Sequence, residues 1–258
     1  QPFAHIPGTI MFCVFDGHGP HGHNVSQECM HSIYYELEET KEDLVADATR
    51  AMTDAFLETG AHLVAMCADE ELTVNATASG ACALVAFMHG RELWVAGAGD
   101  CRAIIGRRGE DGALTALPMS RDHQVDDPIE KARLEAAGGY VRPETKDADG
   151  DMIPSRLYTH EGGKQPGLRV SRVLGDCAVK HLVTCEPDVY NHTCDAADEF
   201  LIMASDGIWE FLDNETVLKF VEKSWKQKGR AEDACKSICV QAVLQWRQHE
   251  GDYRDDIT

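Results

Sequence analysis

The chain has 258 residues, of which 24 are Lys or Arg and 44 are Asp or Glu, giving a formal net charge of −20 at pH 7. Such an acidic chain does not suit binding to nucleic acid or anionic lipid, because both need basic residues against phosphate. No run of residues is apolar enough and long enough to cross a bilayer, so we expect no membrane insertion. The ten cysteines lack CxxC spacing and several lie in apolar runs, which favours an intracellular location, in the cytoplasm or the nucleus.

In the first half of the chain, short apolar runs alternate with amphipathic stretches. Residues 10–15 predict a buried strand, and residues 25–39 and 43–67 predict helices, because apolar side chains recur there at helical spacing. Three β-prone runs follow, and we expect them to pair as an antiparallel meander: residues 81–87, 92–98 and 102–105.

The second half begins with a helix predicted over residues 128–137, with Asp127 as its N-cap and Pro128 as its first residue. Residues 142–168 are rich in Gly, Pro, Asp and Lys without periodicity, and a loop of this length in a compact domain is often a functional flap. The predicted elements that remain are a strand over 200–205 and helices over 214–225 and 231–248. This mixed order of strands and helices favours the α+β class.

Aspartates stand where the predicted strands end. Asp16, Asp100 and Asp206 each follow an apolar run directly, and Asp255 lies near the end of the chain. A single Asp-Gly after a strand is ordinarily a turn, but the repetition indicates a site at the edge of one sheet. Crowded carboxylates are costly to bury unless a cation neutralises them. Oxygen ligands without sulfur select Mg²⁺ or Mn²⁺, so the pattern predicts a divalent cation.

The segments that carry these aspartates resemble the signature motifs of the type 2C, metal-dependent (PPM) protein phosphatases, in the same order along the chain. They are VFDGHG at 14–19, AGDCR at 98–102, DHQ to AGG over 122–139, VSRVLGD at 170–176 and ASDGIW at 204–209. The resemblance covers essentially the whole chain. It implies one monomeric phosphatase domain over residues 1–258, trimmed at both ends, with an α+β fold. That fold is a four-layer αββα sandwich, in which helices flank two antiparallel β-sheets.

The resemblance also implies a set of metal ligands. Asp16 would bridge two Mg²⁺ or Mn²⁺ ions, and the backbone carbonyl of Gly17 would bind one of them. Asp206 and Asp255 would complete the ligands of the second ion. Asp255 is preferred to the aspartate after it because the metal aspartate of the family directly follows a basic or polar residue, as Asp255 follows Arg254.

Further residues receive roles around these ligands. Asp100 and Glu210 would lie behind the metal ligands or hold a third, weaker cation, although the family more often has Asp where this chain has Glu210. Two cations that share a water lower its pKa and orient it toward a phosphoester, and His18 would protonate the leaving alkoxide. The alternative for His18 is a structural, hydrogen-bonded imidazole. His21 and His23 are expected in an exposed loop.

Three features bear on whether the chain is active. Family members carry an Arg and a Glu-Asp pair upstream of the first motif, whereas residues 1–11 contain no Arg, Asp or Glu. Cys82 stands where the family usually has Thr, and the 142–168 flap would shape substrate choice. Two functions remain open: a serine/threonine phosphatase acting on phosphoproteins, or a weakly active or inactive binding or regulatory module. Retention of the metal-type aspartates and of His18 favours the enzyme.

Overall fold

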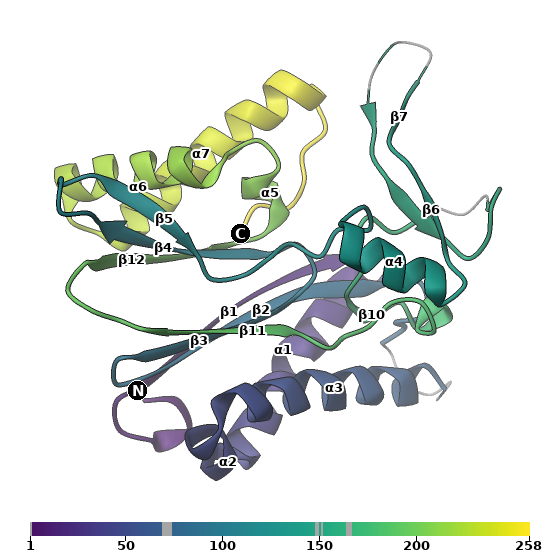
Figure 1. Ribbon diagram of the computed structural model, residues 1–258, viewed down its shortest axis with the longest axis horizontal. Coiled ribbons are helices and arrows are strands. Elements are labelled where there is room, and N and C mark those ends of the chain that lie inside the picture. Colours follow the sequence, from purple (N-terminus) through teal and green to yellow (C-terminus); the bar gives the residue numbers. More distant parts are fainter. Residues whose placement is uncertain (1, 69–73, 148–149, 151, 164–166) are drawn as a thin grey trace.

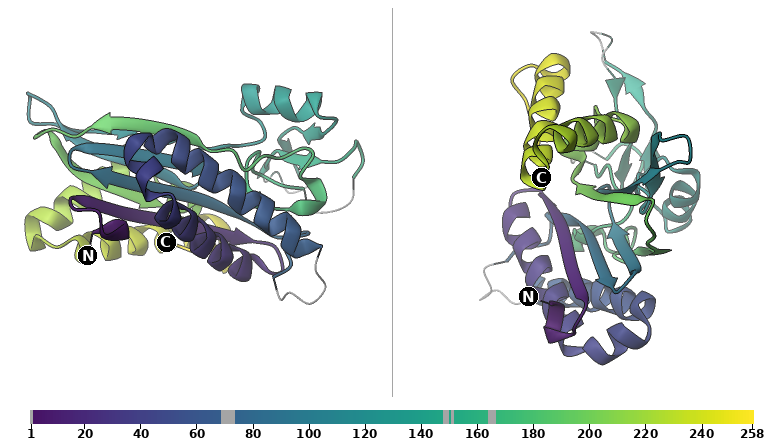
Figure 2. Two further views of the ribbon diagram at one scale, coloured as in Figure 1. Left: turned by 90° about the horizontal axis from the view of Figure 1, so that it is seen from below. Right: turned by 90° about the vertical axis from the view of Figure 1, so that its left-hand side faces the viewer.

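The computed structural model describes residues 2–68, 74–147, 150, 152–163 and 167–258. Two antiparallel sheets lie face to face, and helices cover the outer face of each sheet (Figures 1 and 2). Apolar side chains of both sheets fill the space between them, among them Val14, Leu84 and Ile105. The predicted α+β class and the αββα sandwich are therefore confirmed.

The larger sheet contains the strand that carries the first aspartate motif. Its order is β1-β2-β3-β11, and the short β10 pairs with the end of β2. The strands are β1 (Thr9–His18), β2 (Gly80–His89), β3 (Glu92–Ala98), β10 (Leu174–Gly175) and β11 (Asp188–Thr193). Both faces of β2 are covered, so its first eight residues are all buried. This double burial explains why β2 is a continuous apolar run without alternation.

Three helices cover the outer face of this sheet: α1 (Gly22–Glu39), α2 (Lys41–Ala46) and α3 (Ala48–Cys67). The single helix predicted over 43–67 is divided at Asp47, whose side chain accepts a hydrogen bond from the backbone N–H of Arg50 and so caps α3. Because α1 begins earlier than predicted, His23 lies in its first turn and not in a loop. Among the described residues, no helix is both long and apolar enough to span a membrane.

The smaller sheet has the order β12-β4-β5 and is covered by two long helices. The elements are β4 (Arg102–Arg108), β5 (Leu114–Pro118), β12 (Asp198–Ala204), the short α5 (Asp206–Trp209), α6 (Asn214–Lys228) and α7 (Ala231–Glu250). Apolar side chains of α6 and α7, such as Val217, Ile238 and Trp246, pack against Ile104 of β4.

The predicted meander is wrong at its last strand, because β4 pairs with β12 and β5 and not with β3. Residues 99–101 carry the chain from one sheet to the other. Gly99 has a φ of 114°, and a β-carbon there would lie 2.4 Å from Sγ of Cys82. Only glycine fits this crossing. In the sequence, a tight hairpin and a crossing between two sheets both show only a short break between two strands. The break at 99–101 therefore could not distinguish them.

A projection at one end of the sandwich contains the predicted flap (Figure 1). It consists of α4 (Pro128–Ala136) and four short strands, β6 (Tyr140–Arg142), β7 (Thr145–Lys146), β8 (Met152–Ile153) and β9 (Arg156–Tyr158). Strand β6 pairs with β9 and β7 with β8, so the 142–168 segment, expected to be irregular, holds paired strands. Part of that segment lies outside the described residues. Two single-turn 3-10 helices complete the fold, Phe3–His5 and Cys177–Val179.

Candidate metal centre and active site

A cavity of about 860 Å³ is lined by residues of the larger sheet, of the projection and of α5, which follows the smaller sheet. Asp16, Gly17, His18, Asp100, Asp206 and Asp255 all line it. The structure therefore brings together every residue predicted for the site except Glu210, which is not among the lining residues.

The carboxylates reach this cavity from different parts of the fold. Asp16 lies in β1 opposite Cys82 of β2, and Asp100 follows β3, so both come from the larger sheet. Asp206 begins α5 directly after β12 of the smaller sheet, and Asp255 belongs to the segment after α7. The expectation that the strand ends share one sheet is wrong. The aspartates converge because the two sheets are stacked.

Two motif glycines permit close backbone contacts at the site. A β-carbon on Gly17 would lie 2.2 Å from the carbonyl oxygen of Gly22, and one on Gly207 would lie 2.1 Å from that of Asp256. Gly17 thus lets α1 pack against the end of β1, and Gly207 lets the C-terminal segment pack against α5. Ser205 fixes that segment, because its hydroxyl donates to the carbonyl of Asp256 at 3.1 Å. The neighbouring Asp255 is consequently placed at the cavity.

Burial and mutual repulsion make the carboxylates hard to ionise without a cation. Burial is the largest cause that raises the pKa of Asp16 to about 6; the hydrogen bond with Asp206 opposes it, and the charges of Asp255 and Asp100 add to it. Burial also raises the pKa of Asp206 to about 9, together with the charges of Asp100, Asp16 and Asp255. Oδ1 of Asp206 is buried with no hydrogen-bond partner among the described residues. Buried, repelling oxygen ligands of this kind fit a hard divalent cation.

A second, smaller cavity of about 280 Å³ adjoins the first, and Asp16 and Gly17 line both. Asp256 and His23 also line the smaller cavity. Across the part of the chain that the structure describes, the pocket aspartates form no group of three ligand atoms within 4.8 Å of one another.

His18 is held by a buried aspartate that sequence reasoning did not single out. Its Nε2 lies 2.6 Å from Oδ2 of Asp176, which is 5% exposed. Burial lowers the pKa of His18, but the hydrogen bond and the charge of Asp176, with the charges of Asp100 and Asp16, outweigh it and raise the pKa. A β-carbon on Gly80 would lie 2.6 Å from Oδ2 of Asp176, so glycine is needed beside the pair. Asp176 is the last residue of VSRVLGD, and its position in that motif was the available signal.

The two residues predicted to lie behind the ligands differ in their surroundings. Asp100 is 7% exposed and is hydrogen-bonded to the thiol of Cys82, the residue at the usual Thr position. Glu210 lies outside the cavity and forms an ion pair with Arg169, whose Nη2 is 3.0 and 3.2 Å from the two carboxylate oxygens. The Glu210 carboxylate is therefore paired with a guanidinium in this structure.

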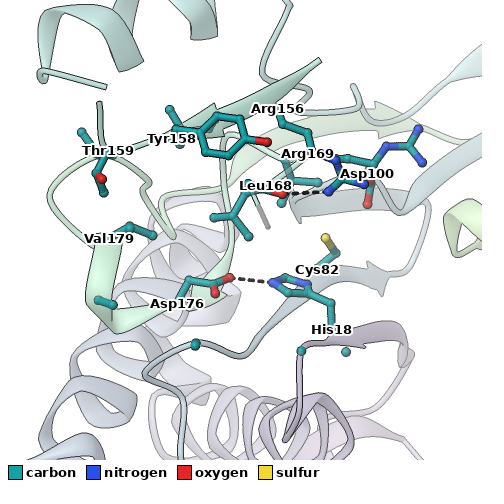
Figure 3. A pocket seen from close by; sticks show the side chains of 18 of the residues that line it. His18, Cys82, Asp100, Arg156, Tyr158, Thr159, Leu168, Arg169, Asp176 and Val179 are labelled. Atoms are coloured by element: carbon teal, nitrogen blue, oxygen red, sulfur yellow. Dashed lines mark hydrogen bonds and ion pairs between the residues drawn. The ribbon is translucent and has the colours of Figure 1, made fainter. Parts of the chain in front are cut away.

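Two arginines form the wall of the cavity opposite His18 and Asp176, as Figure 3 shows. Arg156 in β9 donates from Nη1 to the carbonyl of Gly167 at 2.7 Å and has no carboxylate partner in the described ranges. Burial lowers the pKa of Arg156, and the charge of Arg169 lowers it further. Neither arginine was predicted from the sequence. The amino-acid composition of a segment can indicate a flap, but it does not show which basic side chains face the site.

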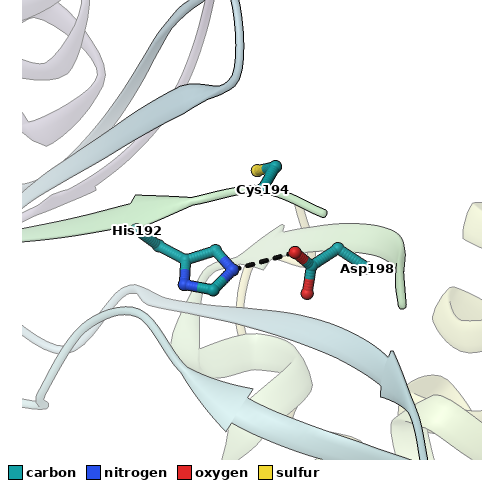
Figure 4. A group of neighbouring side chains, drawn as sticks. All are labelled: His192, Cys194 and Asp198. Atoms are coloured by element: carbon teal, nitrogen blue, oxygen red, sulfur yellow. Dashed lines mark hydrogen bonds and ion pairs between the residues drawn. The ribbon is translucent and has the colours of Figure 1, made fainter. Parts of the chain in front are cut away.

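Another group of potential ligands lies away from this cavity, in the residues 188–204 that form β11, β12 and their connection (Figure 4). Ligand atoms of His192, Cys194 and Asp198 lie within 4.8 Å of one another, and Nε2 of His192 is 2.9 Å from Oδ2 of Asp198. Arg107 donates to Oδ1 of Asp198 at 2.5 Å, and its Nη1 lies 3.4 Å from Nε2 of His192. A guanidinium already neutralises this group, so we read it as an ion-pair network that joins the sheets.

Comparison with known proteins identifies the family. The family model "Protein phosphatase 2C" matches residues 7–250. Two proteins of Oryza sativa subsp. japonica, probable protein phosphatases 2C 57 and 27, are 32% and 31% identical over 91% and 89% of this chain. The chain spans only 58% and 59% of their lengths. Probable protein phosphatase 2C 72 of Arabidopsis thaliana is 30% identical, over 93% of this chain and 72% of its own length.

Solved structures show the same fold. A serine-threonine phosphatase 2C from Toxoplasma gondii has a TM-score of 0.74 at 22% identity and covers 98% of this chain, which covers 84% of it. A C. elegans sex determining protein has a TM-score of 0.73 at 19% identity; the match covers 96% of this chain and 55% of that one. The sequence matches, supported by this shared fold, show that the chain belongs to the protein phosphatase 2C family.

Proposed function

We propose that the chain is the catalytic domain of a serine/threonine protein phosphatase, which hydrolyses phosphoserine and phosphothreonine in phosphoproteins at a centre of two Mg²⁺ or Mn²⁺ ions. One observation carries this proposal. Asp16 lines two adjoining cavities, and around it lie partly buried carboxylates that repel one another and include an oxygen of Asp206 without a hydrogen-bond partner in the described residues. Membership of the phosphatase 2C family supports the same reaction.

The residues divide into ligands and a proton donor. Asp16, the carbonyl of Gly17, Asp206 and Asp255 would hold the two ions, which when bound supply a nucleophilic water and neutralise charge on the phosphoryl group. His18 donates a proton to the leaving serine or threonine alkoxide, which is otherwise a poor leaving group. Asp176 orients the ring and favours its protonated form through the 2.6 Å hydrogen bond.

The arginine wall gives the substrate phosphate a partner of opposite charge. A phosphoester that enters the cavity would approach carboxylates on one side and the guanidinium of Arg156 on the other. Guanidinium groups bind phosphate oxygens in pairs of parallel hydrogen bonds, so Arg156 is suited to orienting the phosphoryl group. Because Arg156 has no carboxylate partner in the described part of the chain, its side chain can move to the phosphate without breaking an ion pair.

The test is phosphate release from a phosphothreonine peptide, measured after chelation and again after addition of Mn²⁺ or Mg²⁺. We expect turnover only with a divalent cation, in the wild type and in an Asp54→Asn control, whose residue lies exposed on α3. Mn²⁺ binding without turnover would support the alternative of a binding or regulatory module. Turnover that survives chelation would contradict the metal mechanism.

We further propose that the domain is a monomer inside the cell, in the cytoplasm or the nucleus. All ten cysteines are free thiols and several are buried, which suits a reducing compartment. Sedimentation velocity and the location of a tagged protein in cells test these two statements separately. A concentration-dependent dimer would contradict the first, and a tagged protein found in the medium would contradict the second.

The pair of Asp176 and His18 makes a prediction that depends on the leaving group. Asp176→Asn should lower kcat for a phosphothreonine peptide by about 10- to 100-fold, because His18 loses the partner that orients and charges it. The pKa of His18 should fall, so the high-pH limb of the kcat profile should move to lower pH. Hydrolysis of p-nitrophenyl phosphate, whose leaving group needs no proton, should change little. Equal losses with both substrates would contradict this role.

A further inference from the structure

Backbone hydrogen bonds hold the segment that carries Arg169, the partner of Glu210 in an ion pair. The carbonyl of Arg169 accepts a hydrogen bond from the N–H of Val125 at 3.0 Å, and Ser171 N–H donates to the carbonyl of His123 at 2.8 Å. These bonds tie the segment after the flap to the segment that precedes α4. The guanidinium of Arg169 is therefore presented from an anchored strand-like segment, and not from the tip of the projection.

The guanidinium of Arg169 binds the carboxylate of Glu210 and is attracted by the charges of two further carboxylates. Burial lowers the pKa of Arg169, but Glu210, by its charge and its hydrogen bond, and then the charges of Asp100 and Asp206 outweigh burial and raise that pKa. The Arg169 side chain is 33% exposed and lines the cavity, whereas Glu210 is not among the lining residues. The positive charge of Arg169 thus lies at the cavity that Asp100 and Asp206 also line.

A third divalent cation on Asp100 and Glu210 would compete with this arrangement. It would have to take Glu210 from Arg169, whose Nη2 is within 3.2 Å of both oxygens, and it would then lie beside the displaced guanidinium. Two like charges in a partly buried site repel strongly. Glu210 is also one methylene longer than aspartate, and this extra length lets its carboxylate reach Arg169 outside the cavity.

We propose that the guanidinium of Arg169 takes the place of a third divalent cation. The centre then binds two metal ions, and the protein itself supplies the positive charge beside Glu210. The proposal rests on the two-ion centre proposed above. Arg169 pairs with Glu210 at all metal concentrations, and the Glu210 carboxylate is not a metal ligand. Metal binding should then end at two ions even when the free cation concentration is raised into the millimolar range.

The test counts bound Mn²⁺ by electron paramagnetic resonance of the free ion, which does not depend on activity. We expect two ions in the wild type and three in Arg169→Met, with the third bound more weakly than the first two. The double variant Arg169→Met with Glu210→Gln should return to two ions. Arg142→Met is the matched control, because Arg142 lies in the same projection over the ring of Tyr158 and should leave the count at two.

The outcomes separate this inference from the proposed function. Three ions on the wild type, or two on Arg169→Met, would overturn the replacement of a cation by Arg169 and leave the two-ion centre standing. No ion on the wild type would overturn the two-ion centre itself, and the inference with it. Thermal unfolding of each variant shows whether it is folded, and Arg169→Lys provides a second variant that keeps the charge and should keep the count at two.

Discussion

Replacing Asp206 with Asn should have opposite effects on activity and on the stability of the metal-free protein. Phosphothreonine hydrolysis with Mn²⁺ should fall by about 100-fold or more, because the proposed two-ion centre would lose a ligand. Without metal, the same substitution removes a carboxyl group whose ionised form is repelled by Asp16, Asp100 and Asp255. The midpoint of thermal unfolding should therefore rise by on the order of 3 °C.

The stability of the metal-free protein should fall as the pH rises, because the site carboxylates have raised pKa values. Asp206 has a pKa of about 9 and Asp16 of about 6 in the fold, both above the value of about 4 for an unperturbed Asp. A raised carboxylate pKa means that the folded state binds protons more tightly than the unfolded state. The associated stability is present below pH ~4 and is lost as pH rises through the two folded values. Saturating Mn²⁺ should abolish this loss.

Thermal unfolding in chelator and in Mn²⁺, between mildly acid and alkaline pH, measures both effects. Asp54→Asn is the control, because Asp54 is exposed and its ion pair in the described part of the chain is with Arg50 on the same helix. It should change neither activity nor the dependence of stability on pH. Destabilisation of the metal-free protein by Asp206→Asn would contradict the repulsion among the site carboxylates.

The second large effect concerns stability and lies outside the cavity, at Glu130 of α4. This side chain is almost fully buried, and its two oxygens are bound by different arginines. Arg172 donates to Oε1 at 2.7 and 3.1 Å, and Arg133 donates to Oε2 at 2.9 and 3.2 Å. Arg172 also binds Asp188 at the start of β11, so the network connects α4, the segment after the flap and the larger sheet.

Glu130→Ala should destabilise the protein by about 3–5 kcal/mol, because it leaves two partly buried guanidinium groups without their shared partner. The unfolding midpoint should fall by about 10 °C. Burial raises the pKa of Glu130, but the hydrogen bonds from Arg172 and Arg133 outweigh burial and lower it to about 2. This depressed pKa gives stability above pH ~4.5 that is lost as pH falls toward the folded value.

Chemical denaturation of the wild type and Glu130→Ala at neutral and acid pH measures this contribution. Glu135→Ala is the matched control on the same helix, because Glu135 is half-exposed and lies 3.9 Å from Lys131. It should change the free energy of unfolding by less than about 1 kcal/mol. If both variants lost similar stability, the buried network would not be what connects the projection to the sandwich.

Sequence motifs placed most of the site, because a catalytic aspartate after a buried strand leaves a local pattern. Asp16, Asp100 and Asp206 all line the same cavity. The pattern did not show that they come from two stacked sheets, since the break before β4 is equally short for a hairpin and for a crossing. The partner of His18 was also hidden, because Asp176 is 158 residues away along the chain. Pairing at that separation depends on topology, which local spacing does not encode.

The assignment of Glu210 shows another limit of sequence reasoning. The position of Glu210 directly after the ASDGIW motif predicted a residue behind the ligands or at a third ion. In the structure its carboxylate pairs with Arg169, which lies 41 residues earlier and after the flap. A glutamate and an arginine so far apart carry no spacing signal, and the extra methylene that permits the contact matters only once the fold is known.

The most direct test of the proposed centre is an anomalous difference map from crystals of this chain grown with Mn²⁺. We expect two peaks on either side of Asp16, one of them facing Asp206 and Asp255, and no peak between Asp100 and Glu210. No peak beside Asp16, or a single peak at the His192 group, would contradict a two-ion centre in this cavity.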